Sequence, residues 1–152
     1  ITGIEISIIG QGNIFIIPLS LQLGYTYINP IDKNYIPTNP ATDEILKYRY
    51  NHTFKANADL TLKWFELGVS VKYNSFMTNI DEIFNIAIPG VGEYRRVHKN
   101  GDWIFDSRIS YIINEKSNIS LIIKNLLNTE YMYVTGNMGA PRVFQLQYNM
   151  SY

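Results

Sequence analysis

The chain has 152 residues, carries a formal net charge of zero and contains no cysteine. This length suits one domain, the charge gives no electrostatic reason to expect a nucleic-acid partner, and the lack of cysteine excludes disulfides and thiolate metal sites within these residues. A membrane-spanning helix needs roughly 18 or more apolar residues in a row. The longest apolar stretch, 14–23, is interrupted by Pro18, Ser20 and Gln22, so the sequence predicts no such helix.

Apolar and polar residues alternate along most of the chain, and this period of two predicts β-strands. The alternation is clearest near the end, where Leu146 and Tyr148 are separated by Gln147 and followed by Asn149. In chain order, the predicted strands are 3–9, 14–28, 52–62, 66–78, 102–113, 118–124 and 144–152. The sequence therefore predicts an all-β chain of seven antiparallel strands.

The segments between the predicted strands alternate strictly in length. Short connections are predicted near 10–13, 63–65 and 114–117, and long ones at 29–51, 79–101 and 126–140. In an antiparallel meander every second connection lies at the same end, so one rim carries tight turns and the other carries large loops. This layout is typical of transmembrane β-barrels, which have short periplasmic turns and long extracellular loops.

The two faces of the predicted strands differ in a way that favours a membrane barrel over a soluble sandwich. Aromatic residues make up 14% of the chain and gather toward strand ends, as in the interfacial girdles of outer-membrane barrels. Lys, Asp, Asn, Gln and Arg lie well inside the strands on the opposite face, as expected of a water-filled lumen. Leu146 is thus predicted to face lipid, and Gln147 to face the lumen.

An odd number of strands predicts that the barrel contains more chain than these residues. Single-chain bacterial barrels have an even number of strands, and an open sheet would leave unpaired edges in hydrocarbon. The chain begins Ile-Thr-Gly, without the pattern of a signal peptide. We therefore expect further strands upstream of Ile1.

A specific pattern follows the predicted strand 118–124. Asn125, Leu126, Asn128 and Tyr131 form an Asn-Leu-hydrophobic-Asn-x-x-Tyr sequence. After a loop come Arg142 and Phe144, in a Pro-Arg-x-Phe entry to the last strand, and the chain ends on the aromatic residue Tyr152. From about residue 102 onward the chain resembles the end of a TonB-dependent outer-membrane receptor.

The resemblance implies a fold and a set of partners. The fold would be an antiparallel up-and-down transmembrane β-barrel of about 22 strands, with residues 1–152 supplying the last seven. A plug elsewhere in the polypeptide would contact TonB, and Tyr152 would belong to the signal read by the barrel-assembly machinery. The protein would lie in the bacterial outer membrane, with its C-terminus facing the periplasm and lipopolysaccharide around its outer rim. It would import a siderophore, haem, cobalamin or glycan, without a cofactor and without covalent chemistry.

The long segment 79–101 holds the candidate ligand-binding residues. The basic, partly aromatic cluster consists of Tyr94, Arg95, Arg96, His98 and Lys99. It could bind an anionic ligand such as a ferric chelate, or it could be a solvated loop that contacts lipopolysaccharide. The two histidines, His52 and His98, lack the close spacing of a paired metal motif. No catalytic constellation is predicted.

Two other functions are compatible with the residues. One is a passive outer-membrane porin or an adhesin-type barrel, which an upstream plug sequence would exclude. The other is a soluble β-sandwich binding module, which would bury its aromatic residues instead of exposing them to lipid.

Overall fold

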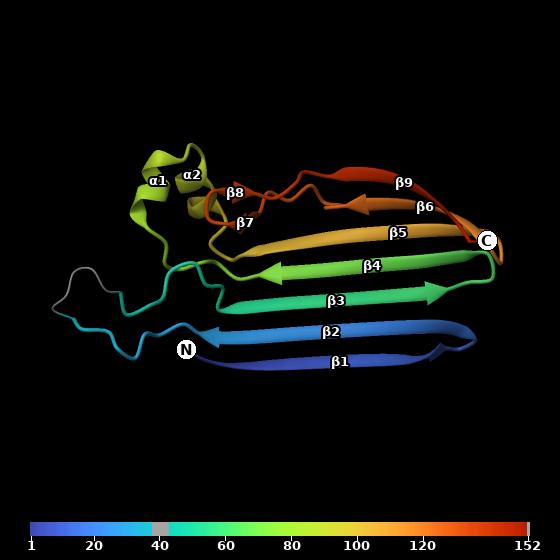
Figure 1. The fold of residues 1–152 in the computed structure, drawn as a ribbon, viewed down its shortest axis with the longest axis horizontal. Helices are drawn as coiled ribbons and strands as arrows, with labels where there is room; N and C mark the ends of the chain where they lie inside the picture. The colour runs from blue at the N-terminus through green and yellow to red at the C-terminus, as the bar shows by residue number, and fades with distance from the viewer. Residues whose placement is uncertain (38–42, 152) are drawn as a thin grey trace.

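The computed structural model describes residues 1–37 and 43–151, and it confirms an all-β chain with antiparallel strands. Figure 1 shows seven strands side by side, in the order β1-β2-β3-β4-β5-β6-β9. Their bounds are β1 (Thr2–Ile14), β2 (Ile17–Asn29), β3 (His52–Thr61), β4 (Phe65–Asn74), β5 (Asp102–Asn114), β6 (Ser117–Lys124) and β9 (Val143–Met150). The outer strands β1 and β9 do not pair with each other in the part of the chain that is described, so this sheet is open.

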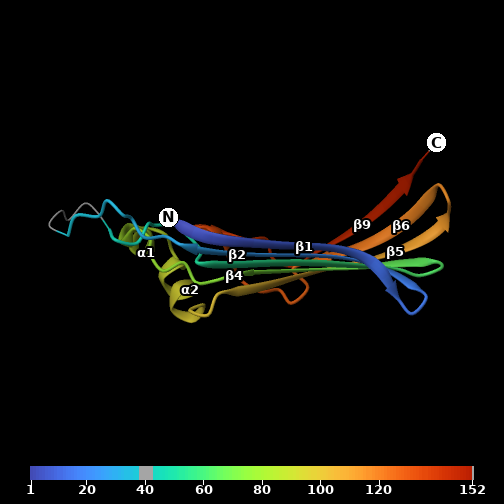
Figure 2. The same cartoon turned by 90° about the horizontal axis from the view of Figure 1, so that it is seen from below.

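The remaining elements lie at one end of the sheet. They are the helices α1 (Glu82–Ala87) and α2 (Val91–Val97), and a two-stranded sheet of β7 (Met132–Val134) and β8 (Asn137–Met138). Figure 1 shows this end on the left and the tight turns on the right, and Figure 2 shows the large sheet as a single twisted layer. No helix among the described residues is long and apolar enough to cross a membrane.

The first predicted turn is wrong. Gly10 and Gly12 were expected to form a connection near 10–13, but both lie inside β1, where they pair with Leu21 and Leu19. The chain turns instead at Phe15 and Ile16, with Phe15 at a φ of 55°. Glycine lacks a side chain but can still adopt an extended conformation, and the two apolar turn residues carry none of the usual turn signals.

The structure also differs from the sequence prediction in the segment 79–101. Strand β4 ends at Asn74, four residues earlier than predicted, and the connection to β5 contains α1 and α2 instead of irregular loop. Ile80, Phe84, Ile88 and Val91 recur at intervals of three or four residues, the spacing that places side chains on one side of a helical turn. Both helices have fewer than eight residues, so this periodicity is too short to stand out in the sequence.

The register of the sheet brings the apolar residues of all seven strands onto one face. Tyr25, Phe54, Tyr73 and Trp103 occupy consecutive partner positions across β2 to β5, and we call them the cap-side aromatic row. Toward the tight turns, Phe65, Tyr111 and Tyr148 form the turn-side aromatic row, with Ile119 between the last two. Aliphatic residues fill the positions between the rows, including Leu21, Val69, Ile109, Leu121 and Leu146.

No other described element covers the apolar face of the sheet, and on the outer strands β1 and β9 the residues of both faces are almost all exposed. Leu146 in β9 is 74% exposed and Val69 in the central strand β4 is 49% exposed. No described strand residue on the apolar face is buried, whereas six on the opposite, polar face are. These six are Gly68, Asn74, Asp102, Ile104, Ser110 and Ser120. Within the described residues, therefore, the sheet leaves uncovered the face that a water-soluble sheet buries.

Candidate functional site

The long connections gather at one end of the sheet into a small folded unit, which we call the cap (residues 43–51, 75–101 and 125–142). It packs on the polar face: Asp102 and Ile104 are each 7% exposed, whereas Trp103, between them on the apolar face, is 47% exposed. The cap has a hydrophobic core of its own. Its buried members are Met77, Ile80, Val91 and Met132, and Tyr48, Tyr50, Phe84, Ile88 and Tyr94 pack around them.

Tyr94 joins the cap to the sheet. It projects from α2, donates a hydrogen bond to the Asp102 carboxylate at the start of β5, and accepts one from the Met132 amide at 3.1 Å. His98 stacks on the Tyr94 ring at 4.3 Å between centroids and places Nδ1 2.6 Å from the other Asp102 oxygen. Burial, followed by the hydrogen bond to Asp102, raises the pKa of the Tyr94 phenol well above its usual range. The phenol therefore remains a neutral donor at physiological pH.

The two arginines of the predicted ligand-binding cluster have partners within the cap. The Arg95 guanidinium donates to the backbone carbonyl oxygens of Met77 at 2.8 Å and Thr78 at 3.3 Å, and it lies over the Phe76 ring. Arg96 forms an exposed ion pair with Glu93, at 2.6 Å. Arg95 thus fixes the segment before α1, and Arg96 pairs along its own helix.

The five residues of the cluster are not all brought together, although Tyr94, Arg95 and His98 line one small cavity of about 20 Å³. Tyr94 and His98 also line a larger pocket, whereas Arg95, Arg96 and Lys99 do not contribute to its wall. Lys99 forms no ion pair within the described ranges. The prediction that these residues contact an anionic ligand together remains a prediction, and their geometry gives it no support.

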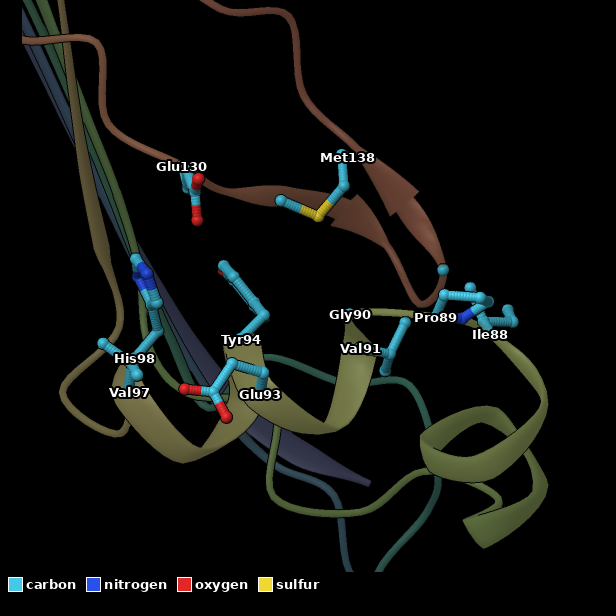
Figure 3. A pocket seen from close by; sticks show the side chains of 11 residues that line it. Ile88, Pro89, Gly90, Val91, Glu93, Tyr94, Val97, His98, Glu130 and Met138 are labelled. Carbon is cyan, nitrogen blue, oxygen red and sulfur yellow. The ribbon is translucent and has the colours of Figure 1, made fainter.

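The pocket has a volume of about 530 Å³ and lies between α2 and the β7–β8 hairpin. Figure 3 shows Glu130 and Met138 reaching toward it from the hairpin side and Tyr94 pointing into it from α2. Its wall is formed by Ile88, Pro89, Gly90, Val91, Glu93, Tyr94, Val97, His98, Glu130, Gly136 and Met138. The pocket thus combines apolar, aromatic and acidic groups and contains neither lysine nor arginine.

The signature residues 125–131 form a tight, hydrogen-bonded turn after β6. Asn125 is 2% exposed, has a φ of 51°, and its side-chain amide donates to the carbonyl oxygens of Thr129 and Ala140 at 2.9 and 3.1 Å. The side-chain oxygen of Asn125 accepts a hydrogen bond from the backbone N–H of Thr129 at 2.9 Å. The backbone N–H of Asn125 donates to the Asp106 carboxylate at 2.7 Å. Asparagine suits this position because it tolerates a positive φ and offers both a donor and an acceptor.

The same turn is fastened to the entry of the last strand. Asn128, with a φ of 54°, accepts a hydrogen bond from the Arg142 amide at 2.8 Å, and the Arg142 guanidinium donates to the Leu126 carbonyl oxygen at 3.3 Å. Arg142 also lies 6.0 Å from the centre of the Phe144 ring. The Tyr131 ring covers Gly139 so closely that a Cβ there would collide with it. These contacts join β6 to β9; Tyr152 lies outside the described residues.

Polar side chains link neighbouring strands across the rest of the polar face. Asp59 and Arg108 form an ion pair at 2.8 Å, and Ser70 donates to the Asn57 side chain at 2.7 Å. They line a hollow of about 360 Å³ beyond the cap. The polar face is therefore hydrogen-bonded across neighbouring strands and carries a hollow beyond the cap.

Two acidic residues of this region were missed in the sequence. Asp102 anchors Tyr94 and His98, and the spacing of His98 and Asp102 by four residues was the only available signal. Glu130 precedes the signature tyrosine, and nothing in the sequence relates it to α2. Within the described residues, no group of three or more histidine, aspartate or glutamate side chains could hold a metal ion. The chain matches no protein-family model and no curated protein sequence.

Proposed function

We propose that this chain forms wall strands of an outer-membrane β-barrel and belongs to a TonB-dependent receptor that imports a bulky, scarce nutrient. The observation that carries the proposal is the distribution of residues in the large sheet. The apolar residues of its seven strands share one face, where no described residue is buried, and all the buried residues of this sheet lie on the other face. An uncovered apolar face is unfavourable in water and favourable in lipid. The ligand class is a siderophore, haem, cobalamin or glycan.

The spacing of the two aromatic rows supports a membrane-spanning sheet. On β4, Tyr73 and Phe65 are eight residues apart. Eight residues at about 3.3 Å each cover about 26 Å along the strand, or roughly 19–22 Å across the membrane at a tilt of 35–45°. This height is comparable with the apolar band of about 25 Å that aromatic girdles flank in outer-membrane barrels.

The two outer strands support the existence of further wall strands. β1 and β9 each have one edge without a strand partner among the described residues. Unpaired backbone N–H and C=O groups cost several kcal/mol each in hydrocarbon, by the usual estimates of about 2–7 kcal/mol for a buried amide. In our proposal, strands outside this sequence pair with both edges and close the barrel.

The position of the cap favours a gated importer over an open porin. In a barrel of this orientation the polar face lines the lumen, so a cap that packs on it narrows the outer mouth. A plug elsewhere in the polypeptide would close the lumen, and TonB would act on that plug. The tight turns would face the periplasm, where the barrel-assembly machinery reads the end of the last strand, and the cap would face lipopolysaccharide and ligand.

A pair of cysteine variants tests the membrane facing. The chain has no cysteine, so Leu146→Cys and Gln147→Cys each introduce a single thiol into it. In outer-membrane vesicles, Leu146→Cys should react with a lipid-soluble maleimide and resist a charged one, and Gln147→Cys should show the reverse preference. Equal reactivity of the two thiols would contradict the proposal that position 146 faces lipid and position 147 faces the lumen.

Uptake measurements test the transport mechanism. Cells that carry the protein should take up one labelled ferric siderophore, haem, cobalamin or oligosaccharide only while TonB is present and the inner membrane is energised. Uptake that continues without TonB would contradict active import and would indicate passive diffusion through the barrel. The cysteine experiment would still stand in that case, because it concerns the wall alone.

A further inference from the structure

The pocket between α2 and the β7–β8 hairpin has the size of a small-molecule site. Its volume of about 530 Å³ lies within the range of roughly 300–1,000 Å³ that is common for ligand pockets. It is formed by two segments distant in the sequence, Ile88 to His98 and Glu130 to Met138. Gly136 at the hairpin tip lies so close to Ile88 that a Cβ there would collide with the Ile88 side chain, so the two walls are packed together.

One carboxylate of the pocket wall has no charged partner in the described part of the chain, and the wall contains neither lysine nor arginine. Glu93 is neutralised by Arg96, whose guanidinium lies 2.6 Å from its carboxylate. Glu130, the other acidic group, forms no ion pair within residues 1–37 and 43–151. The nearby Arg95 is held by carbonyl oxygens outside the pocket wall. A ligand that complements the pocket therefore brings a positive charge to Glu130.

The remaining wall suits an apolar or aromatic body next to that charge. The Tyr94 ring lines the pocket and stacks with His98, and the face of an aromatic ring attracts an organic cation. Met138 supplies a polarisable thioether on the opposite side, and Val97 adds apolar surface. The Tyr94 hydroxyl is already bonded to Asp102 and Met132, so the ring is rigidly held.

We infer that this pocket binds an organic ammonium group attached to an apolar or aromatic body, with the Glu130 carboxylate as the charge partner and the Tyr94 ring as the platform. The inference rests on the proposed function, because the proposed orientation opens the pocket to ligands from outside the cell. It replaces the anionic ligand expected from the basic residues of segment 79–101 with a cationic one.

Two small probes of opposite charge test the inference on the natural-length protein in detergent. Ligand-observed NMR titration, which detects millimolar affinities, would compare 2-phenylethylammonium with phenylacetate, which carries the opposite charge on an aromatic body. We expect saturable binding of the ammonium probe and none of phenylacetate. Equal binding of both probes, or binding of neither, would overturn the inference.

Variants at Glu130 locate the binding. Glu130→Gln should weaken the ammonium probe about tenfold or more, because a charge-assisted hydrogen bond becomes a neutral one. Glu130→Lys should reverse the preference and admit phenylacetate. Glu115→Gln, at the tight turn between β5 and β6, removes the same charge far from the pocket and should leave binding unchanged.

The control variants also separate this inference from the proposed function. Unchanged binding in Glu130→Gln would refute the pocket assignment, since the probe would then bind elsewhere. The cysteine reactivities at positions 146 and 147 would be unaffected by that result. A wrong membrane facing would instead appear in those reactivities, whatever the probes do.

Discussion

In the sheet, Val69 and Leu146 point away from the protein, while Ser110 and Ser120 are buried and hydrogen-bonded to each other at 2.8 Å. In the cap the arrangement is reversed: Met77 and Val91 are buried, and Glu93 and Arg96 of α2 form an exposed ion pair. A single chain thus follows two rules for the placement of apolar groups. The cap buries apolar side chains, as a water-soluble domain does, and the sheet leaves those of one face uncovered by any other described element.

Our proposal accounts for the difference by giving each region its own medium. In that proposal water surrounds the cap, and the hydrophobic effect drives its core together. The hydrophobic effect does not favour burial of apolar side chains that are in contact with hydrocarbon. The strands can therefore turn their apolar side chains to lipid and their polar side chains to the lumen. The boundary between the two regimes lies near the cap-side aromatic row, where Tyr73 donates to the Asn100 carbonyl oxygen of the cap at 3.0 Å.

The largest expected effect is that of a charge placed on the apolar face. Val69 lies midway between Phe65 and Tyr73 on β4, so Val69→Arg should destabilise the protein by about 2–4 kcal/mol, the cost of arginine at the bilayer midplane. Ser70→Arg places the same side chain on the polar face, opposite Asp106, and should be tolerated. Urea unfolding in lipid vesicles measures both; equal losses would remove the distinction between the two faces.

The next effect concerns the cap core. Met132 is 6% exposed, and Met132→Ala should cost about 2–3 kcal/mol of local stability through the cavity that it leaves. Met138→Ala, in a half-exposed position of the same hairpin, is the matched control and should have little effect. Hydrogen exchange should become faster in α1 and α2 and stay unchanged in β4. A parallel acceleration in β4 would mean that cap and sheet unfold as one unit.

A smaller effect is expected where the cap is bonded to the sheet. Tyr94→Phe removes the donor to Asp102 and should cost about 1–2 kcal/mol, because a buried acceptor loses its partner. The raised pKa of Tyr94 means that the neutral phenol stabilises the cap below about pH 10, the pKa of an unfolded tyrosine, and that this contribution is lost as the pH rises further. The phenylalanine variant should lack this alkaline loss. Tyr133→Phe, at an exposed ring, should keep it.

The smallest effect belongs to the outer edge of the cap. Hydrogen bonds from Lys47 and then Tyr48 lower the pKa of Asp81 below its usual range. The ionised carboxylate therefore stabilises the cap above about pH 4, the pKa of an unfolded aspartate, and the contribution is lost as the pH falls below that value. Asp81→Asn should slightly destabilise the cap at neutral pH, and the difference from the parent protein should shrink steadily as the pH falls below about 4. A difference that does not shrink with falling pH would assign the effect to packing.

Much of the fold can be predicted from the sequence because strand alternation is a local property. The residues of β9 alternate one by one, and the strand begins within one residue of its predicted start. The turn at Phe15 and Ile16 could not be predicted, because it depends on the pairing of Ile14 with Ile17 and not on turn-forming residues. The helices of the cap were missed for a similar reason, since tertiary packing of Ile80 and Val91 stabilises them more than their own short periodicity does.

The candidate site is less predictable because its parts meet only after folding. Tyr94 and His98 were expected to lie in a binding segment, and both do line the pocket. Asp102 begins the next strand, and Glu130, which lines the same pocket, comes from the connection after β6. The local pairing of Arg96 with Glu93 cancels a charge that the sequence suggested was free. The charge of the pocket therefore depends on one local ion pair and on the packing of a distant segment against α2.

Every pairing in the large sheet joins strands that follow one another along the chain, with β7 and β8 set aside as a separate hairpin between β6 and β9. Each hairpin can therefore form by closing only its own loop, which keeps the loss of chain entropy small at every step. The same arrangement makes the hairpin a unit of evolutionary change. A duplicated hairpin adds two strands, one tight turn and one long loop. It therefore widens the sheet and adds a loop at one rim, while the existing strand pairings keep their register.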